Sequence, residues 1–320
     1  MIFKFKKPSQ KTQLVMSKVS LGINLDNDFE KICENKIKKI TNHIYGKVTN
    51  CGNSAIFIAI SSIDGPILIP DQGGWNGFKQ IAKFLNKEII TLKTNQGLIT
   101  TEYLDDTIKN QENLSLILTS FAGYSGEQDI KTISKYCREN NITLIEDASA
   151  GIGDDKKRLG NGKYSDIIIA STGSPKIINV GGGGFISSNN SEIFEKTKIL
   201  QKITKVDKIT ASGIATEIDF AKANLTKTLK ATKYLKNNLK NVIHQNKRGV
   251  NVIIKNNNPK ELTWKLKKEL TIDHKSFITK CPNYNRIKEK AVAIEIKNLD
   301  YTSLTKEKLD IIIKAIEKFN

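Results

Sequence analysis

The chain of 320 residues is poor in cysteine and histidine. The four cysteines are Cys33, Cys51, Cys137 and Cys281. They are too far apart for the paired spacing of a zinc site or a disulfide framework, and they favour a reducing compartment. The three histidines are His43, His244 and His274. They are scattered and give no His-acid-Ser order of the kind a hydrolase uses, so neither a metal site nor a catalytic triad is expected.

Long apolar runs are also missing. No stretch approaches the ~20 apolar residues that a membrane-spanning helix needs. The first residues, MIFKFKKPSQK, lack the apolar core of a secretory signal, so we expect a cytoplasmic protein without a membrane segment. A P-loop sequence is absent, and the four glycines at 181–184 precede a strand, whereas a dinucleotide fingerprint opens a helix. These absences argue against P-loop and NAD-binding enzymes.

Positive charge is abundant, but arginine supplies little of it. The 51 basic and 33 acidic residues give a formal net charge of +18, and only four of the basic residues are arginine. Specific nucleic-acid recognition relies on arginine forks and stacked aromatic rings, and both are scarce here. Nucleic acid is therefore not an expected partner. A non-catalytic protein that binds a partner or a polyanion through its lysines remains an alternative.

Apolar strands alternate with amphipathic helices over the first two thirds of the chain. Strands are expected at residues 47–50, 67–70, 88–92, 115–119, 142–147 and 165–170, with helices between most of them. A helix over residues 27–41 precedes them, with Asn27 as its expected N-cap. This alternation predicts an α/β fold with a mainly parallel sheet covered on both faces. Ligands of such sheets bind beyond the carboxyl ends of the strands, so the loops that follow the strands form the candidate site.

An acid and a lysine lie at two of these strand ends. Asp147 ends one strand, and Lys176 follows the next strand in a loop of small residues, STGSPK. Pyridoxal phosphate enzymes need this layout. The lysine amine forms a Schiff base with the cofactor aldehyde, and the carboxylate keeps the pyridine nitrogen protonated. Lys176 is therefore the predicted catalytic residue, and Asp147 is the predicted partner of the cofactor ring.

Three other strand ends supply candidates for the same site. The first strand passes through Gly52, Asn53 and Ser54 into a buried helix, where unpaired backbone N–H groups and the helix dipole favour a phosphate. An ordinary strand-to-helix turn is the alternative. Trp75, in a glycine-rich loop, offers a flat ring to stack on the pyridine, unless it serves only in packing. Tyr124, in the loop after residues 115–119, is a candidate substrate contact.

The last third of the chain predicts a smaller α/β unit. A long amphipathic helix is expected from about residue 214 to residue 242. A strand (249–254), a helix (259–269), a strand (291–296) and a final helix (304–319) follow it. We therefore expect two domains: residues 1–243, which bind the cofactor, and residues 244–320.

Several segments resemble the DegT/DnrJ/StrS family of fold type I pyridoxal phosphate enzymes, most of which are sugar aminotransferases. Residues 145–149, IEDAS, are similar to the I-E-D-A-A segment of the family. Residues 171–186 resemble its S-F-x-x-x-K loop with the glycine cluster and strand that follow. Residues 51–55, CGNSA, resemble its S-G-T-A-A loop, and residues 70–75 correspond loosely to P-x-F-T-[FW]. The resemblance covers roughly residues 25–240.

The resemblance implies a seven-stranded sheet in a three-layer αβα domain, followed by a small C-terminal domain. It also implies a homodimeric aminotransferase whose partners are a small-molecule amino donor and acceptor. Lys176 would be the Schiff-base lysine that also carries protons, and Asp147 would bind the ring nitrogen. Ser171, with Asn53 and Ser54, would hold the cofactor phosphate.

Two departures from the family pattern bear on the substrate. The family usually has a glutamine shortly after the acid, where this chain has Ala150. Its G-x-N-x-R segment is replaced by ASGI at residues 211–214, which includes Ser212. A lyase or another amino-acid enzyme of the same fold is therefore the alternative to a sugar aminotransferase. In that enzyme Arg286 would bind a substrate carboxylate through its two-pronged guanidinium, whereas a plain surface arginine is the other interpretation.

Overall fold

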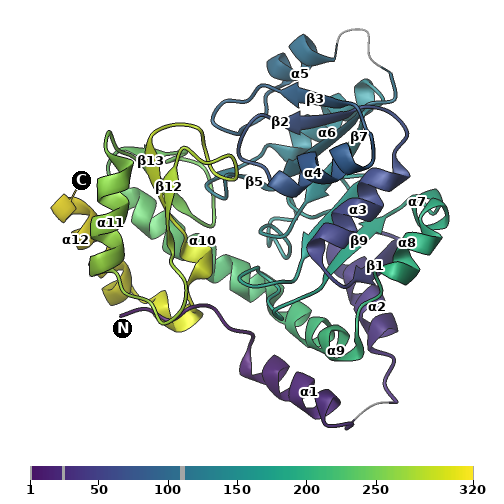
Figure 1. Cartoon of the computed structure of the whole chain (residues 1–320), viewed down its shortest axis with the longest axis horizontal. Coiled ribbons are helices and arrows are strands. Elements are labelled where there is room, and N and C mark those ends of the chain that lie inside the picture. The colour runs from purple at the N-terminus through teal and green to yellow at the C-terminus, as the bar shows by residue number, and fades with distance from the viewer. Residues whose placement is uncertain (1, 24–25, 109–111, 320) are drawn as a thin grey trace.

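A seven-stranded sheet is the centre of the computed structural model, which describes residues 2–23, 26–108 and 112–319 (Figure 1). In spatial order the strands are β1 (Tyr45–Thr49), β9 (Gly184–Ser188), β8 (Ile167–Ser171), β7 (Thr143–Asp147), β4 (Ser115–Thr119), β2 (Ile67–Pro70) and β3 (Ile89–Leu92). Only β9 runs against its neighbours β1 and β8, and the other pairs are parallel. The prediction of a mainly parallel, seven-stranded sheet is confirmed.

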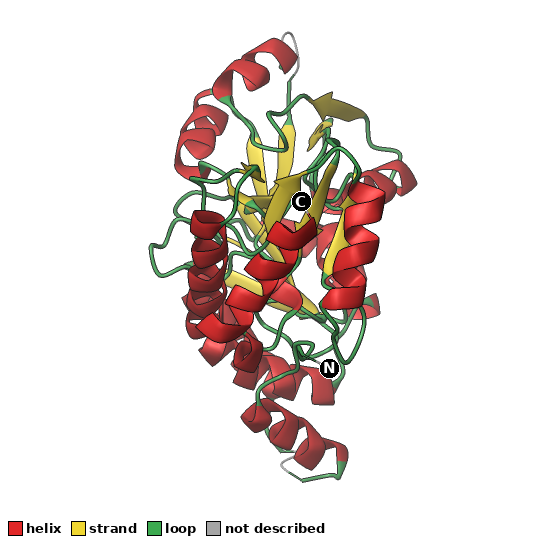
Figure 2. Ribbon diagram, turned by 90° about the vertical axis from the view of Figure 1, so that its left-hand side faces the viewer, coloured by secondary structure: helices red, strands yellow, loops and turns green. Residues whose placement is uncertain are grey.

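Both faces of this sheet are buried, because successive side chains of a strand point to opposite sides. On one face the buried side chains include Leu116, Leu144 and Ile168. On the other face they include Ile117, Ile145 and Ile169. Figure 2 shows the strands in the middle with helices on both sides. The three-layer αβα architecture is therefore confirmed.

The helices divide between the two faces. The face of Ile117 is covered by α3 (Gly52–Ser62), α4 (Asn76–Phe84) and α7 (Glu192–Lys196), with α8 (Lys198–Ile203) beside them. The opposite face is covered by α2 (Phe29–Thr41), α5 (Thr101–Thr107), α6 (Ile130–Glu139) and α9 (Lys208–Glu217). The first helix, α1 (Gln10–Ser20), packs on α9.

Polar side chains fix where several helices begin. Their caps accept a hydrogen bond from a backbone N–H of the first turn: Ser9, Asp28, Asp129, Asp207 and Asn258. The expectation that Asn27 caps α2 is wrong by one residue. Asp28 takes this place, and its Oδ1 accepts from the Lys31 backbone N–H at 3.0 Å.

A second sheet of four antiparallel strands lies beside the first. Its strands are β10 (Val242–Ile243), β11 (Val252–Lys255), β13 (Ala291–Ile294) and β12 (Ile278–Cys281). The helices α10 (Ala221–Asn238), α11 (Pro259–Glu269) and α12 (Lys306–Phe319) share its hydrophobic core. Phe3 is also part of that core. The division of the chain after residue 243 stays a prediction.

The prediction of one long helix over residues 214–242 is wrong. The structure has α9, a 3-10 turn η1 (Ile218–Phe220) and then α10, which ends at Asn238. α9 ends at Glu217, which contacts the N-terminal segment. Its buried Oε2 accepts hydrogen bonds from the Thr12 hydroxyl at 2.6 Å and from the Ser9 backbone N–H at 3.1 Å. The N-terminal segment therefore packs against this junction, through contacts that no local pattern reveals.

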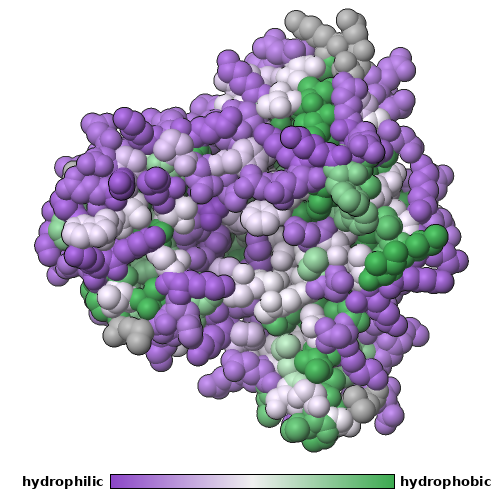
Figure 3. All heavy atoms as spheres, viewed as in Figure 1, coloured by the Kyte–Doolittle hydropathy of each residue, from purple (hydrophilic) through white to green (hydrophobic). Residues whose placement is uncertain are grey.

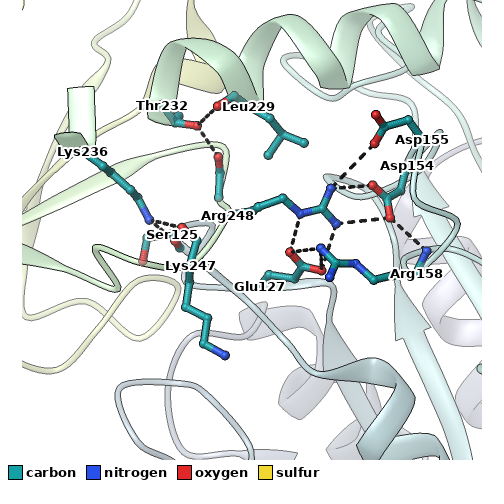
Figure 4. A network of polar contacts seen from close by, with 11 residues as sticks. Ser125, Glu127, Asp154, Asp155, Arg158, Leu229, Thr232, Lys236, Lys247 and Arg248 are labelled. Carbon is teal, nitrogen blue, oxygen red and sulfur yellow. Dashed lines mark hydrogen bonds and ion pairs between the residues drawn. The ribbon is translucent and has the colours of Figure 1, made fainter. Parts of the chain in front are cut away.

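Buried charges join the loops of the first sheet to the start of the second (Figure 4). A short pair of strands, β5 (Phe121–Ala122) and β6 (Gly126–Glu127), carries Glu127. Arg248 pairs with Glu127 and with Asp154, whose Oδ1 lies 2.7 Å from Nη1. Arg158 also pairs with Glu127, at 2.9 Å. Nearby, Lys236 Nζ donates to the carbonyl oxygens of Ser125, His244 and Lys247.

The surface is mostly hydrophilic, with several apolar areas on the face that Figure 3 shows. One lies over α8, where Ile199 and Ile203 are exposed, and another lies at α1, where Leu14 and Leu21 are exposed. Within the described part of the chain, no helix combines the length and the apolar character needed to cross a membrane.

Candidate active site

A cavity of about 250 Å³ opens where β1, β7 and β8 end. It is lined by Cys51, Gly52, Asn53, Ile56, Trp75, Asp147, Ser149, Ile169, Ala170, Ser171, Ser174 and Lys176. Six of the seven predicted cofactor and catalytic positions thus share one space, drawn from four separate segments. Asp147 lies on a strand that pairs in parallel with β8, so its position beside the lysine loop follows from the sheet register.

Asp147 lies buried on the floor of the cavity and is held by a serine two residues on. Its Oδ1 accepts from the Ser149 backbone N–H at 3.0 Å and from the Ser149 hydroxyl at 2.5 Å. The Ser149 hydroxyl oxygen accepts in turn from the Ser171 backbone N–H at 2.8 Å. One carboxylate oxygen is thus anchored, and Oδ2 is left to accept a further N–H group in the cavity.

The N-terminus of α3 faces Ser171 at very short range. A Cβ atom on Gly52 would lie 2.5 Å from Ser171 Cβ, so only glycine allows the two segments to approach this closely. The Ser171 hydroxyl oxygen accepts from the Gly173 backbone N–H at 3.2 Å, which leaves its hydrogen to donate elsewhere. The first N–H groups of a helix lack partners within the helix. This end of the cavity is therefore rich in donors.

Trp75 and Asn53 form the rim. The indole Nε1–H donates to Asn53 Oδ1 at 3.0 Å, and Trp75 is 37% exposed. Ser54 follows Asn53 on α3, but it is not among the lining residues. Its hydroxyl donates to Asn50 Oδ1 at 2.6 Å, so the structure does not bring that side chain to the cavity.

Lys176 points its amine at Tyr124, and Nζ lies 3.0 Å from the phenolic oxygen. Burial lowers the pKa of Lys176, but attraction to Tyr124 and Asp147 and the hydrogen bond to Tyr124 more than offset this effect, so the pKa rises. Burial raises the pKa of Tyr124, but the positive charges of Lys176, Lys297 and Arg286 outweigh it, so the pKa falls. Both shifts favour an ammonium beside a phenolate.

Arg286 does not line the cavity, and its guanidinium is already paired. Its Nε donates to Glu295 Oε1 at 2.6 Å, and Nη1 donates to the Asn285 carbonyl oxygen at 2.7 Å. The guanidinium carbon lies 4.7 Å from the centre of the Tyr124 ring. The side chain is thus close to Lys176 through Tyr124, and a buried carboxylate already occupies part of its fork.

Glu146, next to Asp147, is fully buried behind the cavity. Its oxygens accept from the hydroxyls of Ser120 and Ser165, each at 2.6 Å, and from the Gly160 backbone N–H at 2.9 Å. Burial raises the pKa of Glu146 above its ordinary value, although these hydrogen bonds oppose the shift. Glu146 ties the loops around the strand together and does not face the cavity.

Sequence reasoning missed two groups of residues at this site. Ser149 could have been found, because a serine two residues after an aspartate often bonds back to its side chain. Glu295 and Lys297 gave no signal, since they lie far from Lys176 in the chain. Ala150 and Ser212, the positions that depart from the family pattern, are buried and do not line the cavity.

The residues present fit pyridoxal phosphate. Gly52 and Ser171 form a cradle that even one added methyl group would fill, and its donors suit a phosphate. Asp147 offers a free carboxylate oxygen for a protonated ring nitrogen, and Lys176 offers a primary amine. Among the described residues, no cluster of histidine, cysteine or acidic side chains has the arrangement of a metal site.

Comparison with known families agrees with this arrangement. The profile of the DegT/DnrJ/EryC1/StrS aminotransferase family matches residues 31–232, well over half of the chain. The chain belongs to this family. A second profile, the MJ1341 family C-terminal domain, matches residues 222–317 and so covers the second sheet. The DegT family match contains every residue that lines the cavity.

Relatives of known activity match only part of the chain. A UDP-4-amino-4,6-dideoxy-N-acetyl-beta-L-altrosamine transaminase of Campylobacter jejuni is 37% identical over 116 residues, which are 36% of this chain and 30% of that protein. A dTDP-4-dehydro-2,3,6-trideoxy-D-glucose 4-aminotransferase of Saccharopolyspora spinosa is 24% identical over 157 residues, 47% of this chain and 40% of that one. These matches span less than half of each relative.

Solved structures share the fold over the whole chain. The Helicobacter pylori aminotransferase PseC, involved in the biosynthesis of pseudoaminic acid, superposes with a TM-score of 0.79 at 13% identity, covering 100% of this chain and 99% of that one. An alanine–glyoxylate aminotransferase from Nostoc gives 0.73 at 14% identity, covering 99% and 94%. The fold is that of the fold type I pyridoxal phosphate enzymes.

Proposed function

We propose that this member of the DegT family is a pyridoxal-phosphate-dependent aminotransferase that acts on an amino or keto sugar. The supporting observation is the single cavity that collects Gly52, Asn53, Asp147, Ser171 and Lys176. Each supplies a group that the cofactor requires, and the cavity lies at the carboxyl edge of a mainly parallel sheet.

The residues divide the binding of the cofactor between them. Gly52, Asn53 and Ser171 would hold the phosphate at the start of α3, where the positive end of the helix dipole adds to the hydrogen bonds. Trp75 would cover one face of the ring from the rim. Asp147, its Oδ1 fixed by Ser149, would accept the N–H of the pyridinium through Oδ2.

Lys176 would make the covalent link and carry the proton. When bound, pyridoxal phosphate supplies an aldehyde for that link and a ring that takes up electrons from the carbon next to the amine. The amine of Lys176 lies at the edge of the cavity, within reach of both Tyr124 and the space above Asp147. That position suits a base that removes a proton from one atom and returns it to another.

The substrate, assembly and location follow from the relatives and the surface. The relatives named above act on nucleotide-linked sugars, so we expect such a sugar, with a small amino compound as donor. We also expect a homodimer, because apolar side chains of α1, α4 and α8 are exposed, among them Leu14, Phe84 and Ile199. The four cysteines are free thiols, which suits the cytoplasm.

The decisive test is the covalent link itself. The purified protein should become coloured on addition of pyridoxal phosphate, and borohydride reduction should fix the cofactor on the peptide that contains Lys176. Lys176→Ala should retain the fold and lose both signals, whereas Lys163→Ala, at an exposed lysine outside the cavity, should keep them. A protein that stays colourless and unlabelled would refute the proposal.

The reaction type needs a second measurement. Incubation of the loaded protein with amino donors should convert the cofactor to its amine form, because transamination leaves the amino group on it. An amino-acid lyase of the same fold would instead release product while the cofactor returns to its aldehyde form. The product analysis therefore separates the two activities.

A further inference from the structure

Tyr124 is held next to Lys176 by residues that come just before the second sheet's strands. Its carbonyl oxygen accepts from the backbone N–H groups of Val250 and Asn251, at 2.8 and 2.9 Å. The preceding residue, Gly123, has a φ of +55°, and a Cβ there would lie 2.6 Å from the Arg286 carbonyl oxygen. The loop between β5 and β6 is thus packed tightly against the second unit, and the tyrosine ring has a defined position.

Two cations flank the Tyr124 ring. The Arg286 guanidinium lies 4.7 Å and the Lys297 amine 4.8 Å from the ring centre. Both are paired with the buried Glu295, at 2.6 and 3.0 Å, and Asn251 Nδ2 donates to the same carboxylate at 2.8 Å. Burial raises the pKa of Glu295, but Lys297 and Arg286 outweigh it and keep the pKa below its usual range. The two cations are therefore anchored in place by a carboxylate that stays ionised.

We propose that Tyr124 is the positioning residue of Lys176 and shares one proton with it, as an ammonium–phenolate pair in the cofactor-free protein. When the amine must act as a nucleophile, the proton passes from Lys176 Nζ to the Tyr124 oxygen, so that one N–H bond breaks and one O–H bond forms. This role rests on the proposed function, since it prepares the amine for the cofactor.

At neutral pH a free lysine is an ammonium and a free tyrosine is a neutral phenol, so the Lys176–Tyr124 pair holds one proton less than the two free groups. The surrounding charges explain this difference. Arg286, on the loop between β12 and β13, and Lys297, in η2 (Ile296–Asn298), stabilise the phenolate through their positive charge and their position against the ring. Asp147, at the end of β7, favours the ammonium form of Lys176 and opposes the phenolate. Because the two groups lie 3.0 Å apart, they titrate as a pair.

The test uses protein without cofactor, so it does not depend on aminotransferase activity. The phenolate absorbance of wild type is compared with that of Tyr124→Phe across pH. The difference should show one tyrosine that ionises clearly below the ordinary pKa of 10.0. Lys297→Met should raise that midpoint by roughly one pH unit or more, and Lys297→Arg should not. A step at or above pH 10 in the wild type would overturn the assignment.

The second readout is the reactivity of the Lys176 amine. Trace acylation at a series of pH values, followed by mass spectrometry, gives its titration midpoint. In Tyr124→Phe that midpoint should fall by about 1–3 pH units, because the amine loses its negative partner while burial remains. Tyr103→Phe, at a tyrosine that also has a lysine over its ring, is the matched control and should change nothing. If Tyr124→Phe folds and the titration midpoint of the Lys176 amine is unchanged, the proposal is overturned, because Tyr124 then serves only in packing. Failure to bind pyridoxal phosphate, with both shifts present, would instead count against the proposed function alone.

Discussion

Arg248→Met should destabilise the protein strongly, because Arg248 is the main counterion of a buried carboxylate. The Asp154 side chain is 0% exposed, and it would lose donors at 2.7 and 3.2 Å and keep the Arg158 backbone N–H at 2.9 Å. Removing one partner of a buried ion pair costs about 3–5 kcal/mol. Arg248 is 20% exposed, and in the variant Glu127 would still pair with Arg158. We therefore expect the free energy of unfolding to fall by about 3 kcal/mol, the lower end of that range.

Thermal unfolding at neutral pH measures this loss. A loss of about 3 kcal/mol corresponds to a melting temperature lower by roughly 4–5 °C in a chain of this size. Arg158→Met is the matched control. It removes a half-exposed arginine from the same Glu127, so it should cost less than about 1 kcal/mol. Equal losses in the two variants would refute the argument from burial.

The stability difference between wild type and Arg248→Met should depend on pH, because Asp154 titrates. Burial raises the pKa of Asp154, but the hydrogen bonds and charge of Arg248 and the backbone donors outweigh it, so the pKa lies below 3.8. A carboxyl group whose pKa is lower in the folded than in the unfolded state stabilises the protein at pH values above its unfolded pKa. This contribution is lost as the pH falls through the folded pKa. The difference in the free energy of unfolding between wild type and Arg248→Met should therefore become smaller below pH 4. A gap that widens in acid would contradict the assignment.

Three further predictions concern single sites. Gly52→Ala should cost about 1–3 kcal/mol in unfolding experiments and weaken pyridoxal phosphate binding in a titration, because the new methyl group meets Ser171 at 2.5 Å. His43 is buried with a pKa of about 4 against 6.5 when unfolded, so the unfolded state binds more protons between these values. Stability should thus fall by up to about 3 kcal/mol from pH 6.5 to 4, and His43→Gln should flatten this part of the profile. Ser120→Ala should cost about 1–3 kcal/mol, because it removes a donor from the buried Glu146, and an unchanged urea midpoint would argue against that network.

The helices and strands that the sequence predicts most accurately are those whose signals lie within the element itself. Continuous apolar runs predict β4, β7 and β8, because both faces of their sheet are buried. The α11 helix was placed at its observed ends, since Asn258 and Pro259 mark its start. β12 was not anticipated, because its four residues, ITKC, carry a weak pattern.

The sequence by itself determined the mainly parallel sheet and the placement of Asp147 and Lys176 at strand ends on one edge of it. These follow from alternation along the chain and from the rule that parallel strands end at one edge, which need no knowledge of distant contacts. The tertiary structure alone decided which side chains surround the lysine amine. Tyr124 lies 52 residues before Lys176, and Lys297 comes from η2, which follows the last strand of the second sheet, so their meeting depends on how the two units pack. The charges of these neighbours then shift the pKa values of Lys176 and Tyr124 against the effect of burial, and no spacing in the sequence connects the groups involved.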